Sequence, residues 1–115
     1  MLTSDTNTYT TLRQANQARI LECDPDSKLT LVFFGNEMAG EVGEACNVIK
    51  KVERERLGLP GSRATISDLA DELADVVICA DLVALAEGID LQQAIANKFN
   101  KTSVKVGLKT RLSLD

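Results

Sequence analysis

The amino-acid sequence predicts an all-α protein built from four helices. Aromatic residues make up only 3% of the 115 residues and proline occurs twice, whereas the helix formers Ala, Leu, Glu and Lys are frequent. Apolar residues recur every three or four positions over long stretches, and capping residues stand before several of them. A chain of this length forms one domain, which we assign to residues 1–115.

The first two helices are separated by a proline. We expect the first helix at about Asn7–Cys23, because Asp24-Pro25-Asp26 follows it and proline disfavours helix in the residue before it. A second helix should start within 27–30 and reach Arg56, ahead of a Gly- and Pro-containing loop at 57–63. The spacing of its apolar residues predicts a buried stripe of Leu31, Phe34, Met38, Val42, Ala45, Ile49 and Val52.

The third helix is expected to begin at Thr65–Asp68, which resembles a capped start, and to run to Glu87 before Gly88. Its second half, VVICADLVALA, is apolar on nearly every side. A chain of four helices cannot cover such a helix alone, so we expect a tight homodimer or a dimer of dimers (homotetramer). Asp90 opens a fourth helix that should end within 100–103.

Several classes of protein are disfavoured by composition. The net charge of −4 argues against nucleic-acid binding. The longest apolar run contains Asp81 and is shorter than the roughly 20 residues that span a bilayer, and the polar N-terminus is no signal peptide. Three cysteines without CxxC spacing and the absence of histidine argue against a zinc site. We therefore expect a cytoplasmic protein without nucleic-acid or membrane partners, whose free cysteines pack in the core.

Two acidic stripes stand out along the predicted helices. Glu37, Glu41 and Glu44 follow the i, i+4, i+7 spacing, and the same spacing recurs as Asp68, Glu72 and Asp75. Carboxylates that face one another in a partly buried site repel unless cations lie between them. The stripes therefore predict a site for hard divalent metal ions, most simply Mg²⁺, which prefers oxygen ligands.

Features around these acids favour a metal site over an ordinary solvated helix surface. Gly43 stands inside the second helix, at a cost of about 1 kcal/mol relative to alanine, and close approach of a ligand or another helix there would explain it. Both acidic stripes border apolar stripes, and the first has no basic residue within it before Lys51. Solvated surface acids remain the alternative interpretation of the residues taken alone.

The two acidic pairs resemble a known family. Glu41-x-x-Glu44 and Glu72-Leu-Ala-Asp75 are similar to the ExxE…ExxD signature of the MazG-like all-α nucleoside triphosphate pyrophosphohydrolases. The flanking segments MAGEVGEA, ELADVVICADLVALAEGIDL and ANKFNK extend the resemblance over about residues 30–103. Many members have a further glutamate directly before the position of Glu41, where this chain has Gly40.

The resemblance implies a four-helix MazG-like bundle that hydrolyses a (d)NTP to the (d)NMP and pyrophosphate, as nucleotide-pool house-cleaning. Glu41, Glu44, Glu72 and Asp75 would hold Mg²⁺, with Mn²⁺ as a possible substitute, and Glu41 would also orient or deprotonate the attacking water. The further residues that would contact the substrate are Glu37, Lys51, Asn97, Lys98, Asn100 and Lys101.

Two other functions are compatible with the same residues. Phosphoribosyl-ATP pyrophosphohydrolases belong to the same broad superfamily and carry similar acidic helices. A non-catalytic helical interaction module would keep the fold without turnover, and the missing acid at Gly40 leaves this possibility open. The preferred base and sugar are not indicated by the sequence.

Overall fold

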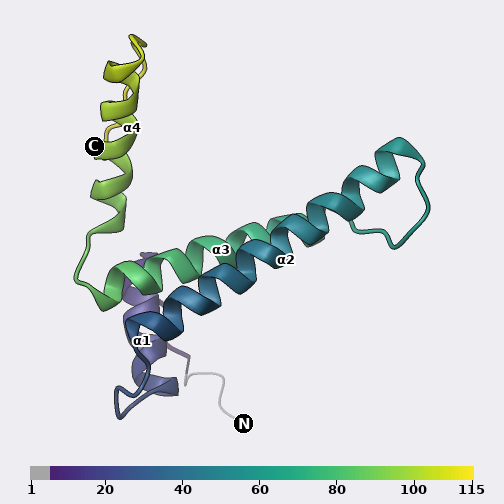
Figure 1. Ribbon diagram of the computed structural model, residues 1–115. Coiled ribbons are helices and arrows are strands. Elements are labelled where there is room, and N and C mark those ends of the chain that lie inside the picture. Colours follow the sequence, from purple (N-terminus) through teal and green to yellow (C-terminus); the bar gives the residue numbers. More distant parts are fainter. Residues whose placement is uncertain (1–5) are drawn as a thin grey trace.

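The computed structural model describes residues 6–115, which form four helices and no strand. The helices are α1 (Leu12–Cys23), α2 (Leu31–Leu57), α3 (Ile66–Ala86) and α4 (Leu91–Lys105). Helices α2 and α3 pack side by side as an antiparallel hairpin, α1 packs against α3, and α4 stands away from the other three (Figure 1). The prediction of an all-α, four-helix chain is confirmed.

Each helix begins at a polar residue whose side-chain oxygen accepts a backbone N–H of the first turn. These N-caps are Thr11, Thr30, Thr65 and Asp90. At Thr65 the cap is reciprocal, because the carboxylate of Asp68 also accepts the N–H of Thr65. Capping therefore fixes where the helices start.

Two predicted helix boundaries differ from those of the structure. The first helix starts at Leu12 and not at Asn7, because Thr11 is extended and caps it. The last helix continues to Lys105, past the expected end at 100–103, because no residue leaves the helical conformation before the C-cap at Val106 and the left-handed Gly107 (φ 75°).

The hydrophobic core is small. Among the residues predicted as the buried stripe of α2, Phe34, Ala45 and Val52 are buried, but Leu31, Val42 and Ile49 are 42–48% exposed. The difference arises because α3 covers only one side of α2. The three cysteines are free, yet Cys23 and Cys46 are exposed, so the expectation that they pack in the core is wrong for these two.

The chain is more open than a compact monomer of its size. Its radius of gyration is 17.9 Å, whereas a compact chain of this length has about 13 Å. Its accessible surface is 8683 Å², compared with roughly 6,100 Å² for a compact monomer of 12.4 kDa. The chain alone therefore leaves much apolar surface exposed, including Val77 in the apolar half of α3, which is 53% exposed.

A buried ion pair joins α1 to α3. Asp81 is 4% exposed and accepts hydrogen bonds from Arg13 (Nη2–Oδ1, 3.1 Å) and from Asn16 (Nδ2–Oδ2, 2.9 Å). Arg13 also donates to the carbonyl of Ile89, in the turn that leads to α4. Since Asn16 is the only buried residue of α1, this polar contact carries much of the attachment of α1.

The residues after α4 fold back along it. The side-chain amide of Asn100 donates to the carbonyl of Leu112 (2.9 Å), and its oxygen accepts the N–H of Leu112 (2.7 Å). Ser103 of the same helix is buried, and its carbonyl accepts the N–H of Leu108. Over residues 6–115, no helix has both the length and the apolar character that a bilayer crossing requires.

We expect Arg13→Ala to destabilise the protein by about 2–3 kcal/mol, because Asp81 would stay buried with Asn16 as its remaining side-chain partner. Urea unfolding at fixed protein concentration measures the change. Arg19→Ala, an exposed arginine of the same helix, is the matched control. Equal midpoints for the two variants would contradict the role given to the ion pair.

Candidate metal site

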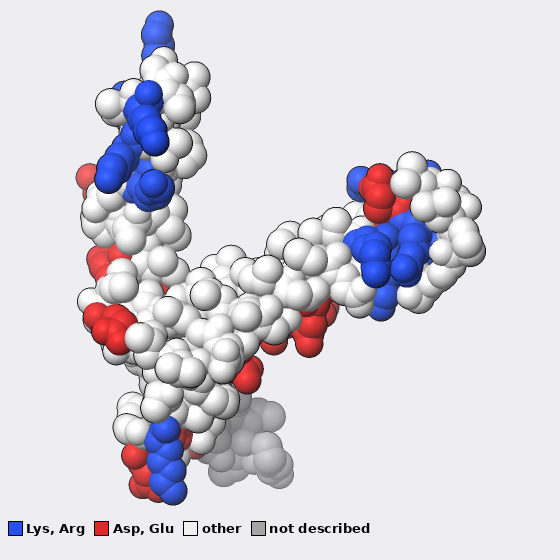
Figure 2. Space-filling model, in the orientation of Figure 1, with Lys and Arg blue, Asp and Glu red and all other residues white. Residues whose placement is uncertain are grey.

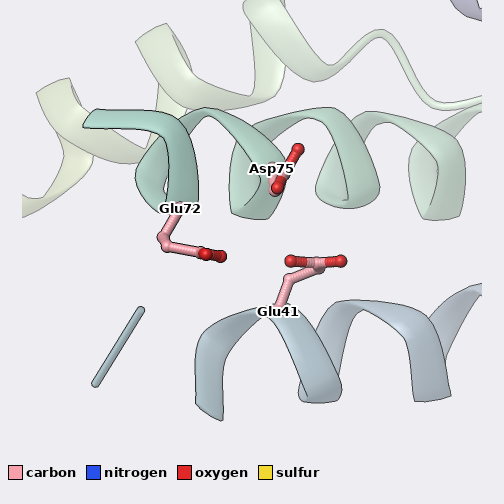
Figure 3. A group of neighbouring side chains, drawn as sticks. All are labelled: Glu41, Glu72 and Asp75. Atoms are coloured by element: carbon pink, nitrogen blue, oxygen red, sulfur yellow. The ribbon is translucent and has the colours of Figure 1, made fainter. Parts of the chain in front are cut away.

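Three carboxylates meet where α2 and α3 face each other. Glu41 extends from α2 toward α3, Glu72 extends from α3 toward α2, and Asp75 lies next to them at the surface of α3 (Figure 3). One oxygen of each side chain lies within 4.8 Å of the other two. Glu72 and Asp75 are three residues apart and so share one side of their helix. The antiparallel pairing of α2 with α3 thus brings acids of both predicted stripes together.

Burial and repulsion both disfavour the ionised form of two of these acids. Burial is the largest cause that raises the pKa of Glu41, followed by the negative charges of Glu44 and Asp75. The pKa of Glu72 is raised by burial first and then by the same two neighbours. The contact between α2 and α3 therefore concentrates negative charge that a cation would stabilise.

Two oxygens of the cluster are enclosed without a hydrogen-bond donor. Oε2 of Glu41 and Oε2 of Glu72 are buried and accept no hydrogen bond from the described part of the chain. The ion pairs formed within residues 6–115 involve none of the three acids. A buried acceptor without a donor is costly. Three close oxygens, two of them unpaired, fit a hard divalent cation such as Mg²⁺ or Mn²⁺.

The other acids predicted for this site lie at its border. Glu44 is exposed and outside the group of three, but its charge raises the pKa values of both Glu41 and Glu72, so it adjoins them. Glu37 is also exposed and lies one turn before Glu41. Asp68 is committed to the cap of α3, where hydrogen bonds with Thr65 lower its pKa.

Cys79 also borders the cluster, although the sequence pattern pointed only to packing. The pKa of its thiol is raised, first by burial and then by the charges of Glu41, Glu37 and Asp75. Its position four residues after Asp75 continues the acidic stripe of α3, and this spacing could have indicated it. A thiol with a raised pKa is protonated at neutral pH, so Cys79 borders the site as an uncharged side chain.

Lys51 lies on the acidic side of the hairpin, beyond the three carboxylates toward the loop. Its ammonium group lowers the pKa of Asp68, after the larger effect of the hydrogen bonds with Thr65. Among the residues described, it forms no ion pair, including with Glu55, which pairs with Arg63 instead. Lys51 is therefore available to an anionic ligand.

The predicted substrate residues of α4 are not brought to the carboxylates within one chain. Lys98 and Lys101 are exposed on α4, which does not pack against the α2–α3 hairpin. Asn97 accepts a hydrogen bond from Gln93, and Asn100 holds the returning segment at Leu112. Asn100 thus has a structural role that the sequence did not indicate.

The two glycines near the acids have open surroundings. A methyl group added at Gly40 or at Gly43 would meet no atom within 4 Å, apart from their own chain neighbours and helix backbone. No other helix of the chain makes the close approach expected at Gly43. Approach by a ligand or by a second subunit stays a prediction.

Comparison of the chain with protein-family models, with curated proteins and with solved structures finds no match to any of them. The resemblance to the MazG-like family therefore rests on the motif residues alone.

We expect Glu41→Gln to raise the melting temperature of the metal-free protein at pH 7, because it removes a charge that burial and neighbouring acids disfavour. A carboxyl whose pKa is raised on folding binds its proton more tightly in the folded state. Its contribution to stability therefore increases as the pH falls from neutral through the raised pKa. As the pH is lowered from 7 to 5, calorimetry should show a smaller rise in melting temperature for Glu41→Gln than for the wild type.

The control for this measurement is Glu53→Gln, an exposed glutamate of the same helix. It should follow the wild-type pH dependence. Glu41→Gln should also remove most of the rise in melting temperature that Mg²⁺ causes at pH 7. A variant that responds to pH and to Mg²⁺ like the wild type would show that Glu41 is not part of a metal site.

Proposed function

We propose that this chain is a magnesium-dependent nucleoside triphosphate pyrophosphohydrolase. It takes a (d)NTP and water and releases the (d)NMP and pyrophosphate, which clears unwanted nucleotides from the pool. The observation that carries the proposal is the group of Glu41, Glu72 and Asp75, with two buried oxygens that lack a donor. The resemblance of the ExxE…ExxD residues to the MazG-like family supplies the reaction.

Glu41, Glu44, Glu72 and Asp75 are the residues that would hold magnesium, or manganese in its place. A divalent ion here would neutralise the carboxylates and offset the charge of the triphosphate. Asp75 and Glu44 are exposed, so the cluster opens to solvent on the side from which a substrate would approach. A phosphate chain with its cation could therefore reach the buried oxygens of Glu41 and Glu72.

The proposed hydrolysis is a single displacement at phosphorus. Water attacks the α phosphorus, the bond to the oxygen that bridges to the β phosphorus breaks, and pyrophosphate leaves. We assign Glu41 as the group that accepts the proton of this water, because it lies opposite the two acids of α3 and its Oε2 accepts no hydrogen bond within the described residues. In this scheme Lys51 neutralises the phosphates, while Glu37 borders the substrate.

The remaining phosphate and nucleoside contacts are proposed to come from α4. Asn97, Lys98 and Lys101 are exposed on this helix, so a triphosphate could meet them once another subunit brings α4 to the site. Asn100 would act indirectly, because its two hydrogen bonds with Leu112 hold the returning segment on the same helix.

The MazG-like bundle is proposed to be completed by self-association. The chain exposes roughly 2,500 Å² more surface than a compact monomer of its mass, which lies at the upper end of what an obligate homodimer interface hides on each subunit. We therefore expect a dimer or a dimer of dimers at micromolar concentration. Sedimentation equilibrium that gives a single 12.4 kDa species would contradict this expectation.

Pyrophosphate release from a panel of canonical and modified NTPs and dNTPs tests the activity. Release should require Mg²⁺ and stop with EDTA. Glu44→Gln and Asp75→Asn should each lower turnover by about 100-fold or more while circular dichroism stays unchanged, since each removes a carboxylate that would hold the magnesium ion. Glu53→Gln should leave turnover unchanged.

Each possible failure has a separate meaning. Near-wild-type rates in either site variant would overturn the ligand assignment. Release from phosphoribosyl-ATP alone would point to the related pyrophosphohydrolase. No release from any substrate by the folded protein would leave the helical interaction module as the better interpretation.

A further inference from the structure

Helix α4 leaves the rest of the chain at the turn that follows α3. We call residues 87–90 of this turn the elbow. Beyond the elbow, α4 does not pack against the α2–α3 hairpin and stands away from it (Figure 1). We propose that Arg13 of α1 is a positioning residue, which binds the elbow and thereby sets the direction of α4 and the place of its lysines. Its part in catalysis rests on the function proposed above, in which those lysines bind the triphosphate.

The two backbone groups of Ile89 in the elbow are bonded to different helices. Its N–H donates to the carbonyl of Ala84 in the last turn of α3 (2.8 Å), where the left-handed Gly88 (φ 65°) ends that helix. Its carbonyl accepts a hydrogen bond from Nη2 of Arg13. Rotation about the bond between Cα and the carbonyl carbon of Ile89 would turn α4 relative to α3. Because the N–H is already fixed, the bond from Arg13 opposes that rotation.

Arg13 is itself held in place by a buried carboxylate. Its Nε and Nη2 both donate to Oδ1 of Asp81 (3.2 and 3.1 Å), and Asp81 is buried in α3. Asn16 donates to the other oxygen of Asp81 (2.9 Å). A planar guanidinium that is fixed along one edge holds its remaining N–H groups in fixed directions. The Ile89 carbonyl is therefore bound by a donor with little freedom of its own.

The space beside the elbow leaves room for α4 to turn. A cavity of about 530 Å³ lies between α1, α3 and the start of α4. Arg13 lines this cavity together with Leu12, Val77 and Ile95. Since the first turns of α4 border a cavity and not a packed core, one side-chain hydrogen bond at the elbow has a large effect on the direction of the helix.

A small rotation at the elbow becomes a large displacement along α4. Lys98 and Lys101 are exposed on this helix, and Figure 2 shows basic groups gathered on it. At about 1.5 Å per residue, Lys101 lies roughly 15 Å from Leu91 along the helix axis, so a rotation of about 20° moves it by about 5 Å. A lysine displaced this far loses its contact with a phosphate.

The direction of α4 can be measured as the distance between two spin labels. One label is attached to Cys46, an exposed thiol in the middle of α2, and the other to Thr102→Cys on the exposed side of α4. Cys23→Ser and Cys79→Ser remove the other two thiols. The labelled chain is diluted with unlabelled chain, so that electron paramagnetic resonance reads the distance within one chain.

The test variant combines Arg13→Met with Asp81→Asn. It removes the guanidinium without leaving a buried charge, and the new amide still accepts the hydrogen bond from Asn16, so the chain should stay folded. The variant should shift the distance between the labels, or broaden its distribution, by roughly 5 Å. Arg19→Met, at an exposed arginine of the same helix, is the matched control and should leave the distance unchanged.

Steady-state kinetics separate positioning from a general loss of structure. The double variant should raise the KM for the triphosphate about 10-fold, because the lysines no longer meet the phosphates. It should leave kcat within about two-fold, because the carboxylates keep their places on the hairpin. A merely destabilised protein would contain fewer active molecules, which lowers kcat and leaves KM unchanged.

The outcomes distinguish this proposal from the proposed function. An unchanged distance in the double variant would overturn the positioning role, whatever the kinetics. A changed distance with an unchanged KM would overturn the part of Arg13 in substrate binding. A wild-type protein that releases no pyrophosphate would overturn the proposed function, and the distance would then still decide whether Arg13 sets the direction of α4.

Discussion

The fold depends on the packing of α2 against α3, and that contact includes charges that repel one another. Phe34, Ala45 and Val52 are buried along it, while Glu41 and Glu72 bring unpaired carboxylate oxygens to the same contact. The apolar residues hold the helices together, and the acids oppose that packing as long as they are ionised and without a cation. If the proposed metal ion binds here, the site gives up stability of the metal-free chain in return for its chemistry, which is a common property of functional centres.

The division of the hairpin into two sides explains the rest of the architecture. One side gathers the carboxylates, and apolar residues such as Ile49 and Val77 are exposed elsewhere on the same two helices. If a second copy covers these apolar residues, the acidic side remains open to solvent and substrate. Association and chemistry then use different faces of the same two helices, and neither blocks the other. The lysines of α4 also remain exposed.

Local signals in the sequence were sufficient for the helices and for most of the acidic cluster. Caps such as Thr65 and Asp90 act within one turn, so the helix starts could be predicted from the sequence. The spacing of Glu72 and Asp75 places them on one side of a helix, so their proximity could be predicted as well. The exposure of Val42 and Ile49 could not be predicted from the sequence, because it depends on which side of α2 the partner helix covers. Asp81 was noticed only as an interruption of an apolar run, since its partner Arg13 lies 68 residues away.

That separation has a consequence for the order of folding. The α2–α3 hairpin joins neighbouring segments through a short loop, so its contacts close at little cost in chain entropy. The contact of Arg13 with Asp81 and Ile89 closes a far longer loop and needs the end of α3 to be formed already. We therefore expect the hairpin to form in the rate-limiting step and α1 to dock afterwards, so that a weakened ion pair accelerates unfolding and leaves the folding rate nearly unchanged.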